Sequence, residues 1–163
     1  MPVAACIAQA AEDYRFNNGF LLNTVKDLSA EEWLKRPTVC TNHISWIVGH
    51  VTWTRKAILA RLGTEWSTPW LGMFARGVKL DETAAYPSPD ALMDAWKEVG
   101  SLLCAALENV SEEALCNDAT PPAPPTADGK ISGVIRFLAW HETYHVGQIS
   151  MVACMLGHKG LMG

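Results

Sequence analysis

Apolar residues recur at helical spacing in four long stretches of the chain, and no stretch shows the strict alternation that is typical of a strand. The third stretch opens with Ser88, Pro89 and Asp90, which provide a cap, a first-turn proline and a first-turn carboxylate. The pattern therefore predicts an all-α protein. Its four long helices are expected over about residues 2–28, 41–62, 88–110 and 130–156.

Helix boundaries are marked elsewhere by polar residues that favour caps. Ser29 and Glu32 have the spacing of a capping box, which predicts a short helical turn after the first helix. Thr41 or Asn42 is expected to cap the second helix, because either side chain can accept a hydrogen bond from the first turn.

Two of the connections between these helices are long and differ in character. Residues 64–87 contain Trp66, Trp70, Met73 and Phe74, and we expect this segment either to roof a functional site or to lie in a subunit contact. Residues 117–129 are rich in proline and are expected to form a stiff, exposed crossover. Unequal connections of this kind predict a four-helix bundle with long crossover connections, formed by residues 1–163 as a single domain.

Composition and charge exclude several classes of function. The 163 residues contain 13 Lys and Arg against 17 Asp and Glu, for a net charge of −4, so the chain lacks the basic footprint of a nucleic-acid-binding protein. No apolar run is long enough to span a membrane, and the N-terminus lacks the basic region of a signal peptide. Five cysteines without a CxxC pair favour free thiols in the cytoplasm.

Two histidines interrupt the apolar stripe of the fourth predicted helix. His141 and His145 lie about 40° apart on a helical wheel, and both replace aliphatic residues in the stripe. This spacing lets two imidazoles reach a common metal ion, although a pair of hydrogen-bonded core histidines is the alternative. His50, in the middle of the second helix, is the preferred third ligand, because His43 lies at a bundle end. His158 lies beyond the last helix and is expected to be solvated.

The segment from His141 to His145, HETYH, also fits the HExxH pattern of zinc metalloproteases, in which Glu142 would be the general base. No Asp or Glu follows Glu142, and the longer metzincin pattern is absent, so a third protease ligand is missing. We therefore disfavour a protease.

Several neighbours of the histidines are candidates to support the site. Gln148 lies about 20° from His141 on the wheel and could orient a ligand or a bound water. Glu142 lies about 100° from His141, so we expect it at the flank of the pocket, bonded to a neighbouring helix. We expect Tyr144 in the core with a wet hydroxyl, and Arg55 in solvent.

The segment HETYHVGQI, together with SWIVGHVTW earlier in the chain, resembles the DinB superfamily, the DinB/YfiT-like metalloenzymes. The resemblance extends over nearly the whole chain. It implies a DinB/YfiT-like bundle in which His50, His141 and His145 bind a divalent metal. It further implies relatedness to metal-dependent transferases and isomerases that use bacillithiol or mycothiol, many of them homodimers.

These observations lead us to expect a divalent-metal-dependent enzyme that acts on a small-molecule substrate. A thiol-dependent transferase and a metal-assisted hydrolase both need a three-histidine site with open coordination positions. Zn or Ni is the preferred ion, and Fe, Mn and Co are alternatives. The contrasting hypothesis is a non-catalytic metal- or ligand-binding protein linked to stress, which a fourth protein ligand closing the site would favour.

Overall fold

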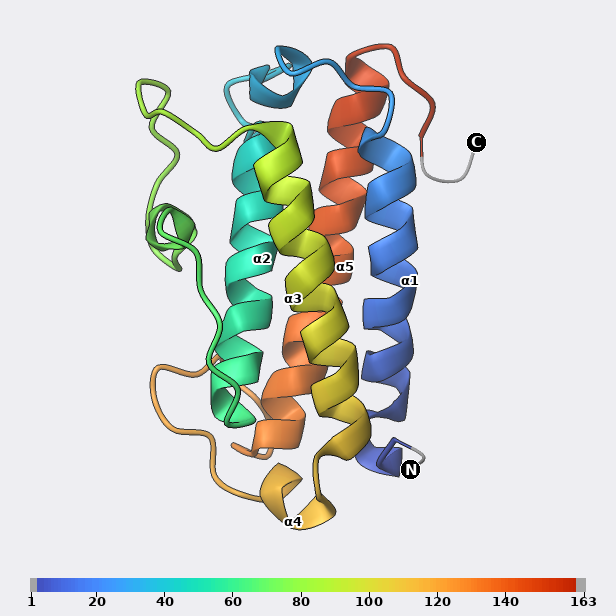
Figure 1. Cartoon of the computed structure of the whole chain (residues 1–163), viewed down its shortest axis with the longest axis vertical. Helices are drawn as coiled ribbons and strands as arrows, with labels where there is room; N and C mark the ends of the chain where they lie inside the picture. Colours follow the sequence, from blue (N-terminus) through green and yellow to red (C-terminus); the bar gives the residue numbers. More distant parts are fainter. Residues whose placement is uncertain (1–2, 161–163) are drawn as a thin grey trace.

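Four long helices lie side by side in the computed structural model, which describes residues 3–160 (Figure 1). They are α1 (Ala8–Val25), α2 (Ile44–Arg61), α3 (Pro89–Asn109) and α5 (Ile131–Met155). The short elements are η1 (Ala5–Ile7), η2 (Glu32–Leu34), η3 (Leu71–Phe74) and α4 (Glu112–Leu115). The described residues contain no strand, only an isolated bridge between Asp118 and Lys130. The predicted all-α fold class is confirmed.

The long helices form a ring in which α1 contacts α3 and α5, and α2 contacts the same two helices. In the view of Figure 1, α1 and α5 run upward, whereas α2 and α3 run downward. The segment between α2 and α3, residues 62–88, therefore travels back along the length of the molecule. It packs η3 against α2 on the way, so it covers one side of that helix.

The helix starts largely follow the expected caps. The Ser88 hydroxyl accepts a hydrogen bond from the amide of Ala91 (3.2 Å), and the Ser29–Glu32 capping box is formed in both directions (2.8 and 3.3 Å). The expected cap of α2 at Thr41 or Asn42 is wrong. His43 is the cap, because its Nδ1 accepts a hydrogen bond from the Trp46 amide at 3.0 Å.

The apolar core consists of two clusters stacked along the bundle. One cluster includes Trp33, Trp46, Phe74, Trp96 and Ile149, with Trp70 and Met73 of the long connection packed against it. The other includes Tyr14, Ile58, Leu103, Ile135 and Ala139. Each long helix contributes to both clusters, which is how burial of its apolar face holds it in the ring.

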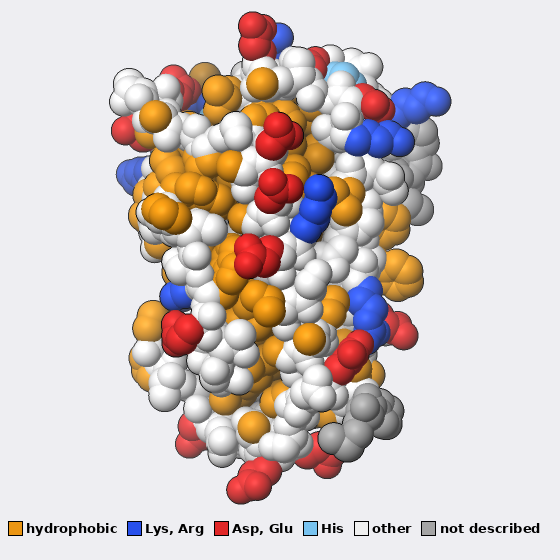
Figure 2. Space-filling model, viewed as in Figure 1, with side chains coloured by type: hydrophobic (Ala, Val, Ile, Leu, Met, Phe, Trp, Pro, Cys, Tyr) orange, Lys and Arg blue, Asp and Glu red, His pale blue; other side chains and the backbone are white. Residues whose placement is uncertain are grey.

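The surface agrees with the acidic composition. On the face that Figure 2 shows, Asp and Glu side chains lie along the middle, over α3, whereas Lys and Arg side chains are scattered. Among the described residues, no helix has the length and apolar character needed to cross a membrane.

The histidine cap of α2 predicts a specific pH dependence of stability. Burial, assisted by the charge of Arg36, lowers the pKa of His43 from 6.5 to about 4. The unfolded chain therefore takes up a proton at a higher pH than the folded protein does, and protonation would also remove the lone pair that caps the helix. We expect the free energy of unfolding to fall as pH decreases from 6.5 towards about 4.

Urea denaturation at several pH values, on the wild type and on His43→Asn, tests this expectation. Asn retains a side-chain acceptor for the cap but does not titrate. The pH-dependent loss of stability should be smaller in the variant. Parallel curves for the two proteins would contradict the assignment.

Candidate metal centre

Three imidazoles from two antiparallel helices meet near the middle of the bundle. His50 comes from α2, and His141 and His145 come from successive turns of α5. One ring nitrogen from each lies within 4.8 Å of the other two, and the Nε2 atoms of His141 and His145 are 3.1 Å apart. Two nitrogens that each lie about 2.1 Å from one ion are about 3.0–3.4 Å apart in octahedral or tetrahedral geometry. The three rings could therefore hold a metal ion.

His50 is held by the long connection between α2 and α3. Its Nδ1 lies 2.9 Å from the carbonyl oxygen of Phe74, which can only accept, so Nδ1 carries the proton and Nε2 is free to bind. The preceding Gly49 makes this contact possible, because a Cβ there would lie 2.5 Å from the Phe74 ring. The ring of Trp46 stacks on the His50 ring with centroids 5.0 Å apart and fixes its plane.

His145 is oriented by a side chain of its own helix. Its Nδ1 lies 2.7 Å from Oε1 of Gln148, and the amide of Gln148 donates to the hydroxyl of Tyr144 at 2.9 Å. In this arrangement Nδ1 donates and Nε2 of His145 faces the other two imidazoles. Tyr144 itself is 54% exposed, so the expectation that it lies in the core is wrong.

His141 completes the donor set and has a polar atom without a partner. Its Nδ1 is buried and makes no hydrogen bond within residues 3–160, while its Nε2 faces His145. Burial lowers the pKa of both His141 and His145 to about 4, with a further contribution from neighbouring imidazoles, and burial also lowers the pKa of His50. All three rings are therefore neutral at neutral pH, which is the form that binds a metal.

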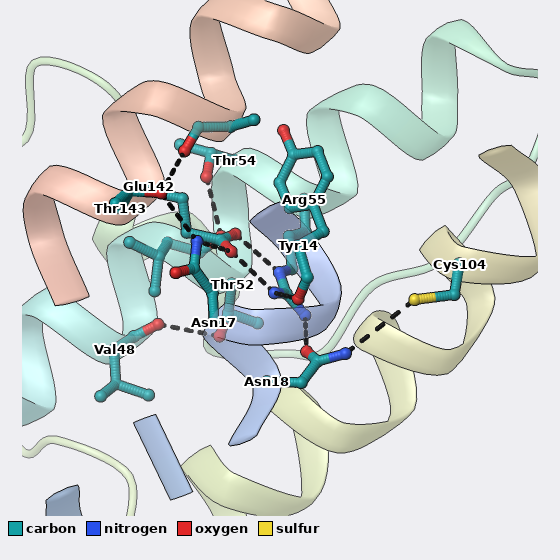
Figure 3. Close-up of polar contacts among 12 residues, drawn as sticks. Tyr14, Asn17, Asn18, Val48, Thr52, Thr54, Arg55, Cys104, Glu142 and Thr143 are labelled. Atoms are coloured by element: carbon teal, nitrogen blue, oxygen red, sulfur yellow. Dashed lines mark hydrogen bonds and ion pairs between the residues drawn. The ribbon is translucent and has the colours of Figure 1, made fainter. Parts of the chain in front are cut away.

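Glu142 is buried inside the bundle and points toward Arg55 and Asn17 (Figure 3). Its two carboxylate oxygens accept hydrogen bonds from Nε and Nη2 of Arg55, both at 2.7 Å, and Oε1 also accepts from the amide of Asn17 at 3.0 Å. Both charged side chains are buried, with 1% and 0% of their surfaces exposed. Glu142 therefore has no access to a reactant bound at the histidines, and this geometry argues against a protease that uses it as a general base.

Arg55 is the hub of this network. Its Nη1 donates to Oδ1 of Asn18 on α1 (2.6 Å), and its guanidinium carbon lies 3.5 Å from the ring centroid of Trp96 on α3. Gly100 leaves room for it, since a Cβ there would lie 2.7 Å from Nη1. The expectation that Arg55 is solvated is wrong. Sequence spacing alone could not reveal its burial. The available signal was that Arg55 lies on the apolar side of its helix, because a buried Arg there requires a buried carboxylate from another part of the chain.

These contacts also correct the predicted orientation of α5. The buried side of this helix is centred on Ile135, Ala139, Glu142, Val146 and Ile149. Glu142 thus occupies the middle of the stripe instead of the flank. The histidines lie to one side of it, where α5 packs against α2.

A cavity of about 510 Å³ opens beside the histidines and is lined by His50 and His141. Trp53 and Ala57 of α2 and Phe137 and Leu138 of α5 form apolar walls. The proline-rich connection, expected to be only an exposed crossover, contributes Pro122, Pro124 and Pro125 to the lining. The four apolar residues of segment 64–87 do not line the cavity; that segment contributes Arg76 instead.

Sequence comparison agrees with this arrangement. A family model described as the DinB superfamily matches residues 19–149, a range that includes all three histidines. The chain belongs to the DinB superfamily. The resemblance inferred from the two histidine motifs is thereby confirmed. No curated protein matches this DinB-superfamily chain in sequence.

The remaining histidines of this DinB-superfamily protein lie outside the cluster. His43 caps α2, as described above. His158 was expected in solvent, but its Nε2 lies 2.9 Å from a carboxylate oxygen of Glu32, which ties the segment after α5 to the turn after α1. The five cysteines are all free, and none of them belongs to the histidine cluster.

We expect Glu142→Gln to destabilise the protein, because it leaves the buried guanidinium of Arg55 without a counter-charge. Loss of one partner of a buried ion pair costs about 3–5 kcal/mol. The matched control is Glu108→Gln, which removes the carboxylate from an exposed pair with Arg15 (3.1 Å) and should cost less than about 1 kcal/mol.

Urea denaturation of both variants checks the difference. If Glu142→Gln were as stable as Glu108→Gln, the ion pair would not hold the bundle. A Glu142→Gln variant that was stable but had lost all activity would instead indicate that Glu142 takes part in the reaction.

Proposed function

We propose that this protein is a divalent-metal-dependent enzyme, with His50, His141 and His145 as the metal ligands. The observation that carries the proposal is the cavity of about 510 Å³ that reaches two of the three histidines. Among the described residues, no Cys, Asp, Glu or fourth His joins the cluster. Three protein ligands beside a cavity are typical of a catalytic metal site, whereas a structural zinc site has four.

The donor set supports Zn or Ni as the ion, with Fe, Mn and Co as alternatives, because neutral imidazoles suit all of these metals. When bound, such an ion would lower the pKa of a thiol or a water towards neutrality and so supply a nucleophile. The preferred reaction is therefore a substitution in which the sulfur of a low-molecular-weight thiol, of the bacillithiol or mycothiol type, bonds to an electrophilic carbon, while the leaving group departs from that carbon and takes up the thiol proton. Metal-assisted hydrolysis is the variant in which water takes the place of the thiol.

The protein's own residues would prepare this reaction by positioning and by excluding water. The carbonyl oxygen of Phe74 and the side-chain oxygen Oε1 of Gln148 accept hydrogen bonds from two of the rings and hold them with Nε2 directed at the shared point. Trp53 and Phe137 form apolar walls next to that point, which would bind the carbon skeleton of a substrate and lower the local dielectric constant. Gln148 is accordingly a positioning residue in this proposal, and Glu142 acts only through the packing of α5.

We further propose a cytoplasmic homodimer. Five free cysteines suit a reducing compartment. On the outer sides of α1 and α5, which pack against each other, several large apolar side chains are exposed: Phe16, Phe20, Trp140, Tyr144, Met151 and Met155. A patch of this kind supports self-association through these two helices, whereas from the sequence a subunit contact through the long connection was one of two alternatives.

We expect protein purified without an affinity tag to contain about one divalent transition metal per chain, and His141→Ala to contain none. The variant should remain helical, because the bundle has two apolar clusters that do not depend on the ligands. Elemental analysis and circular dichroism measure these outcomes. His158→Ala, which alters a histidine outside the cluster, is the control and should retain the metal.

Activity is tested on the same proteins with a panel of thiols and electrophiles, and with esters and amides for hydrolysis. Turnover in the wild type and its loss in His141→Ala would support the proposal. Metal binding without turnover of any compound would favour the non-catalytic binding protein, and unchanged activity without metal would remove the ion from the mechanism.

The dimer is tested by Trp140→Glu, because a charge at this position, 65% exposed, would be buried in the proposed interface. Sedimentation should show a dimeric wild type and a monomeric variant. Lys97→Glu, on the outer face of α3, should remain dimeric. A monomeric wild type at micromolar concentration would contradict the proposal.

A further inference from the structure

The cavity beside the histidines carries an unbalanced positive charge. Its polar lining includes Lys56, Arg61 and Arg76, and no Asp or Glu contributes to it. The protein as a whole has a net charge of −4, so its composition does not account for a cavity lined by three cations and no carboxylate. The cavity is thus electrostatically distinct from the rest of the surface.

The pairing of the arginines shows the same contrast. Four of the six arginines form ion pairs with carboxylates: Arg15, Arg36, Arg55 and Arg136. The other two, Arg61 and Arg76, both line the cavity, and neither forms an ion pair with a described residue. Lys56 likewise has no carboxylate partner there. The protein therefore leaves unpaired the cations that face this space.

Arg61 is partly buried and incompletely satisfied. Its Nη1 donates to the carbonyl of Ala57 (2.7 Å) and its Nη2 to the carbonyl of Pro122, so the guanidinium is anchored between α2 and the proline-rich connection. Its Nε is buried and has no hydrogen-bond partner among the residues that the structure describes. A buried donor without an acceptor costs free energy, which an acceptor supplied by a ligand would recover.

The cavity is elongated along α2. His50, Trp53, Thr54, Ala57 and Arg61 follow one another on the same face of this helix. Arg61 lies eleven positions after His50, which corresponds to about 16 Å along the helix axis. A ligand can therefore reach from the histidines at one end, past an apolar middle, towards Arg61 at the other.

We propose that this cavity binds an organic carboxylate with an apolar body, and that the positive charge of Lys56, Arg61 and Arg76 selects the anion. Arg is suited to this role because its planar fork matches a carboxylate. The proposal deepens the function proposed above and rests on it in one respect: the end of the substrate remote from the carboxylate would lie at the histidines. Binding of the anion itself requires only the cavity and its cations.

The test compares three ligands with the same apolar chain and different charge: octanoate, octanol and octylamine. We expect octanoate to bind at least about tenfold more tightly than octanol, and octylamine not to bind, by isothermal titration calorimetry on the full-length protein. Each titration is performed on metal-loaded protein and on protein stripped with a chelator. The preference for octanoate should persist without metal.

The matched variants each remove two positive charges. Lys56→Gln/Arg76→Gln alters two cavity residues whose side chains make no hydrogen bond with a described residue, and it should reduce octanoate affinity about tenfold or more while octanol binding stays the same. Lys26→Gln/Lys35→Gln alters two exposed cations outside this cavity and should leave octanoate affinity unchanged.

Three outcomes would overturn the inference. They are equal binding of octanol and octanoate, equal effects of the two double variants, and loss of the preference for octanoate when the metal is removed. The last outcome would show that the metal ion, and not the Lys and Arg side chains, holds the carboxylate. If the protein bound no metal but kept the cation-dependent preference for octanoate, the proposal of a metal-dependent enzyme would be wrong and the proposal of a carboxylate-binding cavity would be supported.

Discussion

The buried ion pair between Arg55 and Glu142 joins all four long helices at the level between the two apolar clusters. Arg55 projects from α2 to Glu142 on α5, bonds Asn18 on α1 and lies against Trp96 on α3. Charges this deep are costly unless every polar atom is matched, and breaking such a pair costs more than the pair contributes. Each helix is therefore restricted to the rotation about its axis that satisfies the guanidinium and the carboxylate together.

That setting places the histidines. His141 is the residue directly before Glu142, so an α5 that directs Glu142 to the bundle centre must direct His141 and His145 to the side facing α2. On α2, the rotation that directs Arg55 to Glu142 also directs His50 to the other two histidines. The ion pair takes no part in the proposed chemistry, yet it determines whether three rings share one point. Gly49 and Gly100 help to maintain this arrangement. Each leaves space for a neighbouring side chain, Phe74 and Arg55 respectively, that a Cβ would displace.

The two long connections complete the site from outside the bundle. One supplies the Phe74 carbonyl that selects the tautomer of His50, and also Arg76. The other supplies three prolines, which make an apolar wall with little conformational freedom to lose when a ligand binds. The two connections thus complete a cavity whose other walls, like the candidate ligands, come from α2 and α5. This division is common where a rigid scaffold carries variable chemistry.

The sequence by itself determined the helices and the candidate ligands, since periodicity, caps and the spacing of His141 and His145 are local properties of the chain. Only the tertiary structure decided what each helix face meets. A helical wheel gives angles between residues of one helix, but not which direction is the core, so Glu142 was expected at a flank and Arg55 in solvent. Both are buried because each is the other's partner, 87 residues apart in the chain. The cavity cations and the proline wall were equally beyond local patterns, because unpaired charge and enclosure are defined only by what surrounds a side chain in space.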